Sequence, residues 1–266
     1  MSPTTKTLLD PPIIEAILDV DCDMPIGFDL AKFEDAARRE LGEAYATVDK
    51  RVLLEHQIEL TGTTSTTFDG KQGLQALLFK HADEKQIVQF RTDGYSFNRL
   101  APYATLDDYL PEIERTWRSY VTATGPVQVR RVALRNINRV RLPIRDGELA
   151  LDDYLKLGPG LPDDGRVSFL NLTHHYLVSE TDTGNTAQIV VATEDHSTDE
   201  LPVIIDVATA AYPKLDPSDW KGIVTVIESL RCLKNYLFTN TLRKKCRKRY
   251  RLSPHKRASR SDCRVD

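Results

Sequence analysis

The sequence lacks any long run of apolar residues, although 41% of its 266 residues are hydrophobic. A membrane-spanning helix needs about 18 or more consecutive apolar residues, so the sequence predicts no membrane span. The segment from Met1 to Leu9 has neither a basic start nor an apolar core, which argues against a secretory signal peptide. We therefore expect a globular protein of the cytoplasm.

Cysteine is scarce, and its four residues, Cys22, Cys232, Cys246 and Cys263, form no CxxC pair. That spacing is typical of reduced thiols and not of a disulfide framework or a zinc site. Among the six histidines, only His174 and His175 are adjacent. Neighbouring residues on a regular strand point to opposite faces and cannot bind one metal ion. We expect no metal and no other cofactor.

The common catalytic motifs are also missing. The chain has no phosphate-binding glycine loop, no nucleophile elbow, no HExxH pair and no dinucleotide fingerprint. We assign no catalytic residue, and the sequence favours a non-catalytic protein over an enzyme. The alternative is an enzyme whose site is assembled from distant strands, because such a site leaves no motif.

Basic residues are concentrated at the C-terminus. Residues 243–266 hold 11 Lys and Arg but 2 Asp and Glu, which leaves 25 basic against 37 acidic residues, a net charge of −12, in the rest. We expect this segment to be a disordered basic tail. Its cluster is a candidate nucleic-acid contact: Arg243, Lys244, Lys245, Arg247, Lys248 and Arg249.

The rest of the chain is organised around residues 93–143. The Asp93-Gly94 pair follows an apolar run and predicts a hairpin turn. Thr105 is a suitable N-cap for a helix over 106–122, and a long strand is expected over 127–142. We expect a structural hub in this region, formed by Tyr95, Asn98, Trp117, Asn136 and Asn138. Within it, the side-chain amides of Asn136 and Asn138 should bond to the backbone near Tyr95 and Asn98.

The order of predicted elements repeats on either side of this hub. The first half, 1–125, contains strands at 13–20, 51–60, 74–80, 86–91 and 95–100, helices at 30–41 and 106–122, and a loop or irregular edge at 62–73. The second half, 126–242, contains strands at 127–142, 167–178, 187–193 and 203–210, and helices at 149–157 and 218–242. The pattern predicts a duplicated α+β protein with an antiparallel sheet and two long helices packed on one of its faces.

The strand over 127–142 carries the most unusual pattern. Alternation places Arg131, Arg135, Arg139 and Arg141 on one face, and that face needs counter-charges. The candidates are Glu55 with Glu59 and Glu15 with Asp19. Ion pairs between strands would satisfy the arginines without any function. The alternative is that the arginines, with Glu55 and Glu59, form a face that binds an anion or a protein partner.

Three segments together resemble a sporadically distributed bacterial family of uncharacterised proteins of about this length. They are Pro11-Pro12-Ile13-Ile14-Glu15-Ala16, Gly94-Tyr95-Ser96-Phe97-Asn98-Arg99-Leu100 and Arg135-Asn136-Ile137-Asn138-Arg139-Val140. The resemblance covers residues 8–240 and implies a cytosolic, strain-variable accessory protein with no assigned catalytic residue or cofactor. The basic tail lies outside it.

These observations leave three functional hypotheses. The first is a non-catalytic interaction or ligand-binding protein of the bacterial cytosol, with an unknown protein or a small anionic molecule as partner and a mobile-element or defence context as one interpretation. The second is an enzyme with a site on the open sheet face, and the third is a weak nucleic-acid binder acting through the tail. The oligomeric state does not follow from the sequence.

Overall fold

A computed structural model describes residues 11–61, 65–144, 151–156, 170–195 and 199–248, without the side chains of residues 54–72. The elements in chain order are β1 (Ile13–Asp23), η1 (Leu30–Phe33), α1 (Glu34–Leu41), η2 (Glu43–Tyr45), β2 (Thr47–Thr61), β3 (Ser65–Lys80), β4 (Gln86–Arg91), β5 (Gly94–Leu100), α2 (Leu106–Thr124), β6 (Gln128–Pro143), α3 (Leu151–Tyr154), β7 (Thr173–Ser179), β8 (Thr186–Thr193), β9 (Glu200–Ala211), α4 (Trp220–Thr241) and α5 (Lys244–Arg247).

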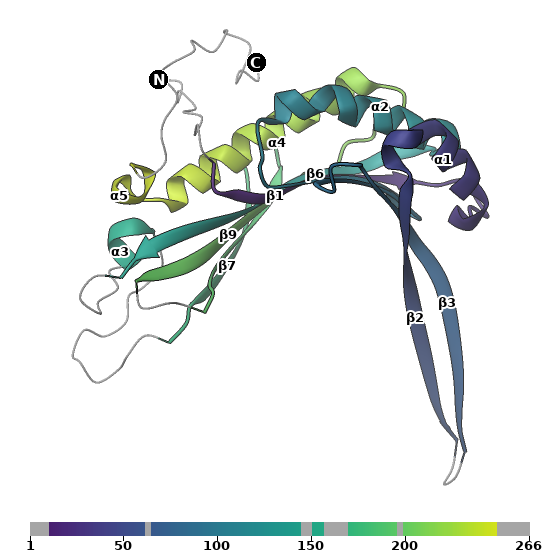
Figure 1. Ribbon diagram of the computed structural model, residues 1–266, viewed down its shortest axis with the longest axis horizontal. Helices are drawn as coiled ribbons and strands as arrows, with labels where there is room; N and C mark the ends of the chain where they lie inside the picture. The colour runs from purple at the N-terminus through teal and green to yellow at the C-terminus, as the bar shows by residue number, and fades with distance from the viewer. Residues whose placement is uncertain (1–10, 62–64, 145–150, 157–169, 196–198, 249–266) are drawn as a thin grey trace.

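The nine strands of the described residues form one sheet in the order β2-β3-β4-β5-β1-β6-β9-β8-β7, and every neighbouring pair is antiparallel. β1 lies near the centre, where Leu18 faces Phe97 of β5 on one side and Leu134 of β6 on the other. This arrangement confirms the predicted α+β class with an antiparallel sheet. Figure 1 shows that the sheet is strongly curved and that the ends of β2 and β3 extend beyond the rest of it.

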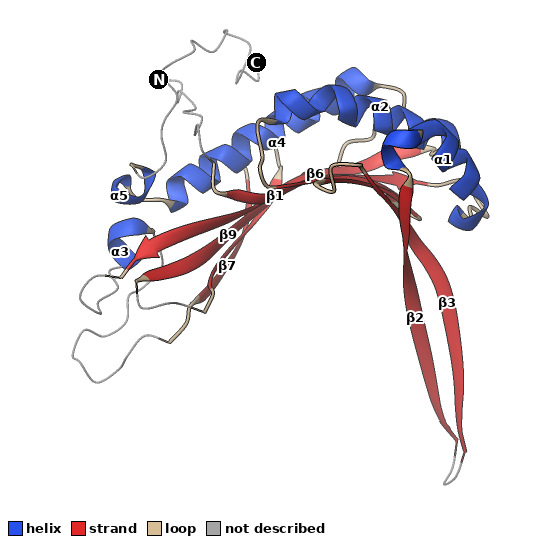
Figure 2. Ribbon diagram, in the orientation of Figure 1, coloured by secondary structure: helices blue, strands red, loops and turns tan. Residues whose placement is uncertain are grey.

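The long helices α2 and α4 lie on the same side of the sheet, and Figure 2 shows no described helix against the opposite face. The main core therefore forms between helices and strands, where Tyr95 meets Trp117 edge-on at 5.6 Å between ring centroids. The strands alternate accordingly, with apolar residues toward the helices and polar residues toward the open face. In β6, for example, Val132, Leu134 and Val140 are buried.

The start and the end of α2 agree with the helix signals in the sequence. The Thr105 hydroxyl accepts from the Asp108 amide, and the Asp108 carboxylate accepts from the Thr105 amide at 3.0 Å, which forms a capping box. Gly125 ends the helix in the left-handed region at φ 59°. Gly94 also has a positive φ, and a Cβ there would lie 2.2 Å from the Val20 carbonyl oxygen.

Several boundaries differ from the sequence-based expectation. The segment 62–73, expected to be a loop or an irregular edge, belongs to β3 from Ser65 onward, because pairing with β2 overrides the low strand propensity of its Gly and Asp residues. β7 begins at Thr173 and α3 spans Leu151–Tyr154, so both are shorter than expected in the described part of the chain. The tail is not disordered at its start, because Lys244–Arg247 forms α5 and Cys246 is buried.

A second core holds this end of the molecule together. It joins α3, α5 and the end of α4 to β6, β8 and β9, with Leu155, Leu242 and Cys246 fully buried. The Arg243 amide donates to the Tyr154 carbonyl at 2.8 Å. Residues 249–266 lie outside the described residues. Within the described part, no helix has the length and hydropathy that a membrane crossing requires.

A candidate ligand-binding cavity between α4 and the sheet

Four of the five arginines of β6, namely Arg131, Arg135, Arg139 and Arg141, lie on the open face, as the alternation predicts, and each meets a carboxylate. Arg131 contacts Asp21 at 3.0 Å, and Arg135 donates from Nε to Asp206 Oδ1 at 2.9 Å. Arg139 binds Glu194 through two nitrogens at 2.8 and 2.9 Å, and Arg141 lies 3.5 Å from Glu200. The open face of β6 is therefore a row of ion pairs.

The carboxylates in this row are not the ones expected from the sequence. Glu15 accepts from the Asn98 side chain at 2.8 Å, and Asp19 accepts from Ser96 at 2.5 Å. Glu55 and Glu59 belong to β2, which four strands separate from β6, and their side chains lie outside the described residues. The partners were missed because Asp206 and Glu194 come from β9 and the end of β8, whose register with β6 cannot be read from sequence.

The proposed hub is divided between the two faces of the sheet. Tyr95 packs on Trp117 on the helix side, whereas Asn98 bonds to Glu15 and to Gln89 on the open side. Asn138 does bond to backbone, but to the carbonyls of Ile205 at 2.9 Å and Asn136 at 3.2 Å and not near Tyr95 or Asn98. Asn136 and Asn138 instead line a cavity.

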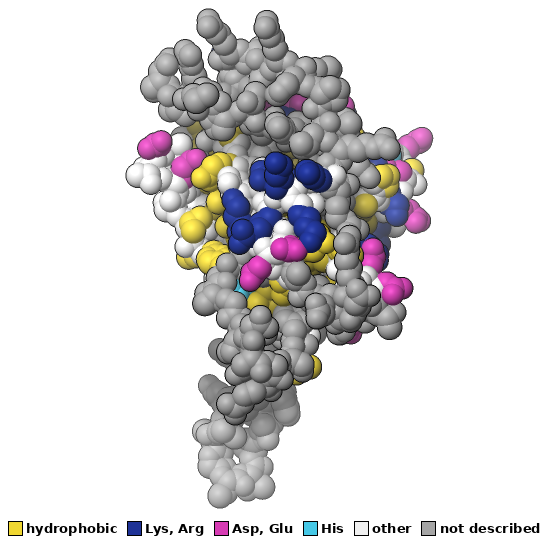
Figure 3. Space-filling model, turned by 90° about the vertical axis from the view of Figure 1, so that its left-hand side faces the viewer, with side chains coloured by type: hydrophobic (Ala, Val, Ile, Leu, Met, Phe, Trp, Pro, Cys, Tyr) yellow, Lys and Arg dark blue, Asp and Glu magenta, His cyan; other side chains and the backbone are white. Residues whose placement is uncertain are grey.

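The candidate tail contacts lie around α5. Figure 3 shows Lys and Arg side chains gathered at that end of the molecule. Lys245 pairs with Asp153 at 2.5 Å, and Arg243 Nε donates to the Leu155 carbonyl at 3.2 Å. Lys244, Arg247 and Lys248 are in the same segment, and Arg249 lies outside the described residues. This basic cluster is thus anchored to α3 at its base.

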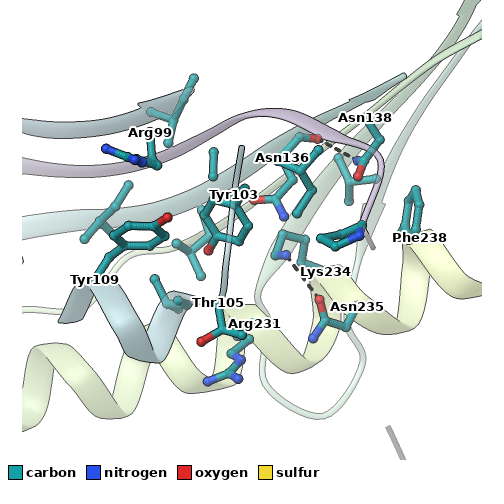
Figure 4. A pocket seen from close by; sticks show the side chains of 18 of the residues that line it. Arg99, Tyr103, Thr105, Tyr109, Asn136, Asn138, Arg231, Lys234, Asn235 and Phe238 are labelled. Atoms are coloured by element: carbon teal, nitrogen blue, oxygen red, sulfur yellow. Dashed lines mark hydrogen bonds between the residues drawn. The ribbon is translucent and has the colours of Figure 1, made fainter. Parts of the chain in front are cut away.

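The cavity lies where α4 and the start of α2 cross the central strands, and its volume is about 130 Å³. Leu18, Phe97, Leu134 and Val207 give it an apolar floor. Its polar lining comes from β5, the 101–105 loop, α2, β6 and α4: Arg99, Tyr103, Thr105, Tyr109, Asn136, Asn138, Arg231, Lys234, Asn235 and Thr239. Figure 4 labels these side chains from Arg99 to Asn235. No described residue that lines it is acidic.

Lys234 is the central polar group of this cavity. Its residue is 9% exposed, and Nζ donates to Asn235 Oδ1 at 3.1 Å. The Asn136 side-chain amide has one orientation in which both its nitrogen and its oxygen form hydrogen bonds. In that orientation Nδ2 donates to the Arg135 carbonyl at 3.0 Å, and Oδ1 accepts from Lys234 Nζ at 2.8 Å. In Figure 4, Asn136 of β6 and Lys234 of α4 point toward each other. Within the described part of the chain, Lys234 forms no ion pair.

Burial controls the charge of this lysine. Loss of hydration and, to a smaller extent, the nearby Arg231 guanidinium lower the pKa of Lys234 to about 7. Arg231 itself is neutralised by Asp107 at 2.7 Å and Glu228 at 3.3 Å. Arg99 pairs with Asp83, so Lys234 is the lining cation that has only amide partners among the described residues.

Two tyrosines, Tyr103 and Tyr109, lie side by side in the lining of the cavity. Burial raises the pKa of Tyr103, and its ring lies 5.3 Å from that of Tyr109. Arg99 stacks on the other ring of the pair, with its guanidinium 5.3 Å from the Tyr109 centroid. The lining therefore offers hydroxyl, amide and cationic groups above an apolar floor.

Sequence reasoning missed Lys234, although the sequence contains a signal for it. The residue lies four positions after Leu230 and four before Phe238, and therefore on the stripe of α4 that faces the core. A lysine on a buried stripe is rare unless it is paired. A lysine on an otherwise apolar stripe was therefore the available signal. Nothing in the sequence, however, shows that a cavity lies next to Lys234.

Metal binding gains no support from the described residues, which contain no group of three or more His, Cys, Asp or Glu able to hold an ion. His174 instead bonds the Tyr176 hydroxyl at 3.1 Å. No protein-family model, curated protein or solved structure matches the chain.

Proposed function

We propose that the protein is a non-catalytic ligand-binding protein that takes a small anion into the cavity in front of Lys234. The observation that supports this most is a buried lysine held by two amide oxygens in a cavity whose described lining has no acidic residue. An unpaired buried cation is costly, and buried charges are normally paired. A bound carboxylate would supply the missing partner.

The size of the cavity limits the ligand. An apolar cavity of about 150 Å³ takes up a molecule the size of benzene. The present cavity, at about 130 Å³, is therefore suited to a ligand of similar or smaller bulk. Its apolar floor favours a short hydrocarbon part, and the lysine and the amides favour an anionic head.

Lactate and 1,2-propanediol form a suitable probe pair, because they are similar in size and only lactate carries a charge. We expect lactate at pH 6 to raise the unfolding temperature of the wild type, because a ligand that binds the folded state stabilises it. Lys234→Met should abolish the shift, whereas Lys221→Met, at an exposed position on the same helix, should retain it. Equal shifts with the diol, or in Lys234→Met, would refute the proposal.

The affinity for lactate should also depend on pH. Its carboxylate stays ionised from pH 6 to 9, whereas Lys234 loses its proton above pH 7, so binding should weaken by up to about tenfold per pH unit. The other charged groups lining the cavity, Arg99 and Arg231, do not titrate in this range. A calorimetric titration at pH 6 and pH 9 measures the difference, and equal affinities at the two pH values would contradict a charged lysine as the binding group.

The location of the cavity agrees with an internal duplication, which we also propose. About the β1–β6 pair, the strand order reads β5-β4-β3 outward on one side and β9-β8-β7 on the other, and a long helix follows each set in the chain. The halves would be 1–125 and 126–242. The cavity would then lie at the junction of the two halves. One side of its lining comes from β1, β5 and α2 of the first half, and the other side comes from β6, β9 and α4 of the second half.

The wider context remains a proposal based on the sequence: an accessory protein of the bacterial cytosol, related to the family it resembles. Nucleic-acid binding through the tail is a second candidate, favoured by the basic cluster around α5 in Figure 3. An enzymatic site on the open face has less support, because the β6 arginines there are already paired.

A further inference from the structure

We propose that Lys234 captures a small 2-oxo acid as an imine, an inference that rests on the proposed function and names its ligand class. The ligand would carry a carbonyl carbon next to its carboxylate. The first group reacts with the lysine nitrogen and the second provides the negative charge that the cavity lacks.

The hydrogen bonds of Lys234 Nζ favour imine formation. A neutral amine has two N–H groups and one lone pair, and two oxygens are in place to accept: Asn136 Oδ1 at 2.8 Å and Asn235 Oδ1 at 3.1 Å. The third tetrahedral direction of Nζ is then left for the lone pair. Because the Asn136 amide is itself fixed to the Arg135 carbonyl, the nitrogen is held in one orientation.

The charge state of Lys234 also favours imine formation. A lysine reacts with a carbonyl only as the free amine, and lysines that form such imines are commonly activated by burial. The same burial that lowers the pKa of Lys234 to about 7 keeps a substantial fraction of it neutral at physiological pH. A surface lysine, with its usual pKa near 10.4, is almost wholly protonated there.

The step balances without an oxidant or a reductant. The lone pair of Nζ forms a C–N bond with the carbonyl carbon, the C–O bond breaks, and the oxygen leaves as water with the two protons that the nitrogen gives up. Tyr103 lines the cavity, and burial keeps its hydroxyl protonated, so it is placed to pass a proton to the departing oxygen. Protonation of the imine then leaves a cation beside the ligand carboxylate.

Reductive trapping tests the inference. The full chain is incubated with pyruvate and cyanoborohydride at pH 7.5, digested, and the modified lysines are located by mass spectrometry. We expect one reduced pyruvate adduct per chain, on Lys234, with no more than trace label on exposed lysines such as Lys221. Excess lactate should slow the labelling, because it occupies the same cavity without a carbonyl to react.

Lysine variants add a second readout. Lys234→Arg keeps a cation but has no nucleophilic amine, so it should lose the adduct, whereas Lys221→Met should keep it. Label distributed over many lysines, or unchanged labelling in Lys234→Arg, would overturn the inference. If lactate binds and pyruvate leaves no adduct on Lys234, the imine is refuted while the proposed anion site stands. If lactate does not bind either, both fail.

Discussion

At the scale of single residues, Lys234 is a buried cation that has no acidic partner among the described residues. Its side chain occupies a core-facing position of α4 with only amide partners among the described residues. Replacing buried ionic groups by apolar residues of similar volume is often neutral or stabilising, by up to about 4 kcal/mol. The ligand-free protein therefore carries a cost that a bound anion would remove.

We predict that Lys234→Met raises the free energy of unfolding by on the order of 1 to 4 kcal/mol at pH 6. Methionine fills nearly the same volume and needs no hydration. Thermal and urea unfolding measure the change, and Lys221→Met should remain within about 0.5 kcal/mol of the wild type, as an exposed substitution does. A lower stability for Lys234→Met would show that the ammonium contributes favourably.

The same residue predicts a dependence of stability on pH. The pKa of Lys234 is about 7 in the folded protein and near its ordinary value of 10.5 when unfolded, so the unfolded chain binds more protons between these limits. Stability should therefore rise as pH increases from about 7 to about 10. The difference between wild type and Lys234→Met in urea titrations isolates this residue, and it should shrink over that range. A constant difference would contradict the lowered pKa.

Asp21 provides a contrasting case on the open face. Its carboxylate joins Arg91 and Arg131, and although burial opposes it, these two guanidinium groups hold the pKa of Asp21 below its usual value. We predict that Asp21→Asn lowers stability by about 3 kcal/mol at neutral pH, because Arg131 loses its carboxylate and Arg91, which keeps Asp93 at 3.1 Å, loses the more buried of its two.

The exposed pair of Arg141 and Glu200, 3.5 Å apart, is the matched comparison, and Arg141→Ala should cost less than about 1 kcal/mol. The Asp21 contribution should be present above about pH 4 and be lost as pH falls through the lowered pKa. Urea unfolding of both variants at pH 7 and pH 3 checks this. Similar losses for the two variants would contradict a special role for Asp21.

At the scale of elements, the turn between β4 and β5 depends on one glycine. A Cβ at Gly94 would lie 2.2 Å from the Val20 carbonyl oxygen and 2.8 Å from the Asp21 Cα, both of which are backbone atoms of β1. The close approach allows β1 to pair along the whole of β5.

We predict that Gly94→Ala lowers stability by on the order of 2 to 4 kcal/mol, since either the turn or β1 must move. Gly125→Ala is the control: its φ is also positive, at 59° against 152° for Gly94, but a Cβ there would have no atom within 4 Å. That variant should cost about 1 to 2 kcal/mol, the ordinary penalty of the left-handed region for a side chain. Equal losses, measured by urea unfolding, would show that the contact with β1 is unimportant.

Elements with strong local signals were predictable from the sequence. The helix after Thr105 and the hairpin at Gly94 follow from capping and turn chemistry, and period-two alternation fixed which face of β6 carries its arginines. The strand character of 65–73 was not predictable, because it comes from pairing with β2. The partners of Arg135 and Arg139 depend on register between strands about 60 residues apart, which leaves no local trace.

The candidate site was predictable only in part. Asn136 and Asn138 stood out as amides on an apolar strand face, which correctly indicated a buried polar environment. Lys234 lies about 100 residues further along, and only the packing of α4 across β6 brings it to Asn136. Cavities are properties of packing, so their positions do not follow from periodicity.

At the scale of the whole molecule, the basic C-terminus divides into an anchored part and a remainder. Deleting residues 243–266 removes α5 with its buried Cys246, so this deletion should lower the unfolding temperature. Deleting 249–266 alone should leave that temperature nearly unchanged.

If the C-terminus binds nucleic acid, the shorter deletion should weaken binding and reduce its salt dependence, which has a log-log slope of about −0.9 per phosphate contact on duplex DNA. Fluorescence anisotropy with duplex DNA from 50 to 200 mM salt measures both. Binding that is unchanged by either deletion would place the polyanion site elsewhere on the molecule.

The central position of β1 has a consequence for how the chain is made. β1 is synthesised first, yet both its neighbours, β5 and β6, come more than 70 residues later. Until they emerge from the ribosome, β1 has no partner strand, and until β1 inserts, β5 and β6 each expose an unpaired edge. Contacts between such distant segments form slowly, and exposed edges pair readily with other chains. An intermediate in which β1 is not yet docked would therefore be vulnerable to strand exchange between molecules at the centre of the sheet.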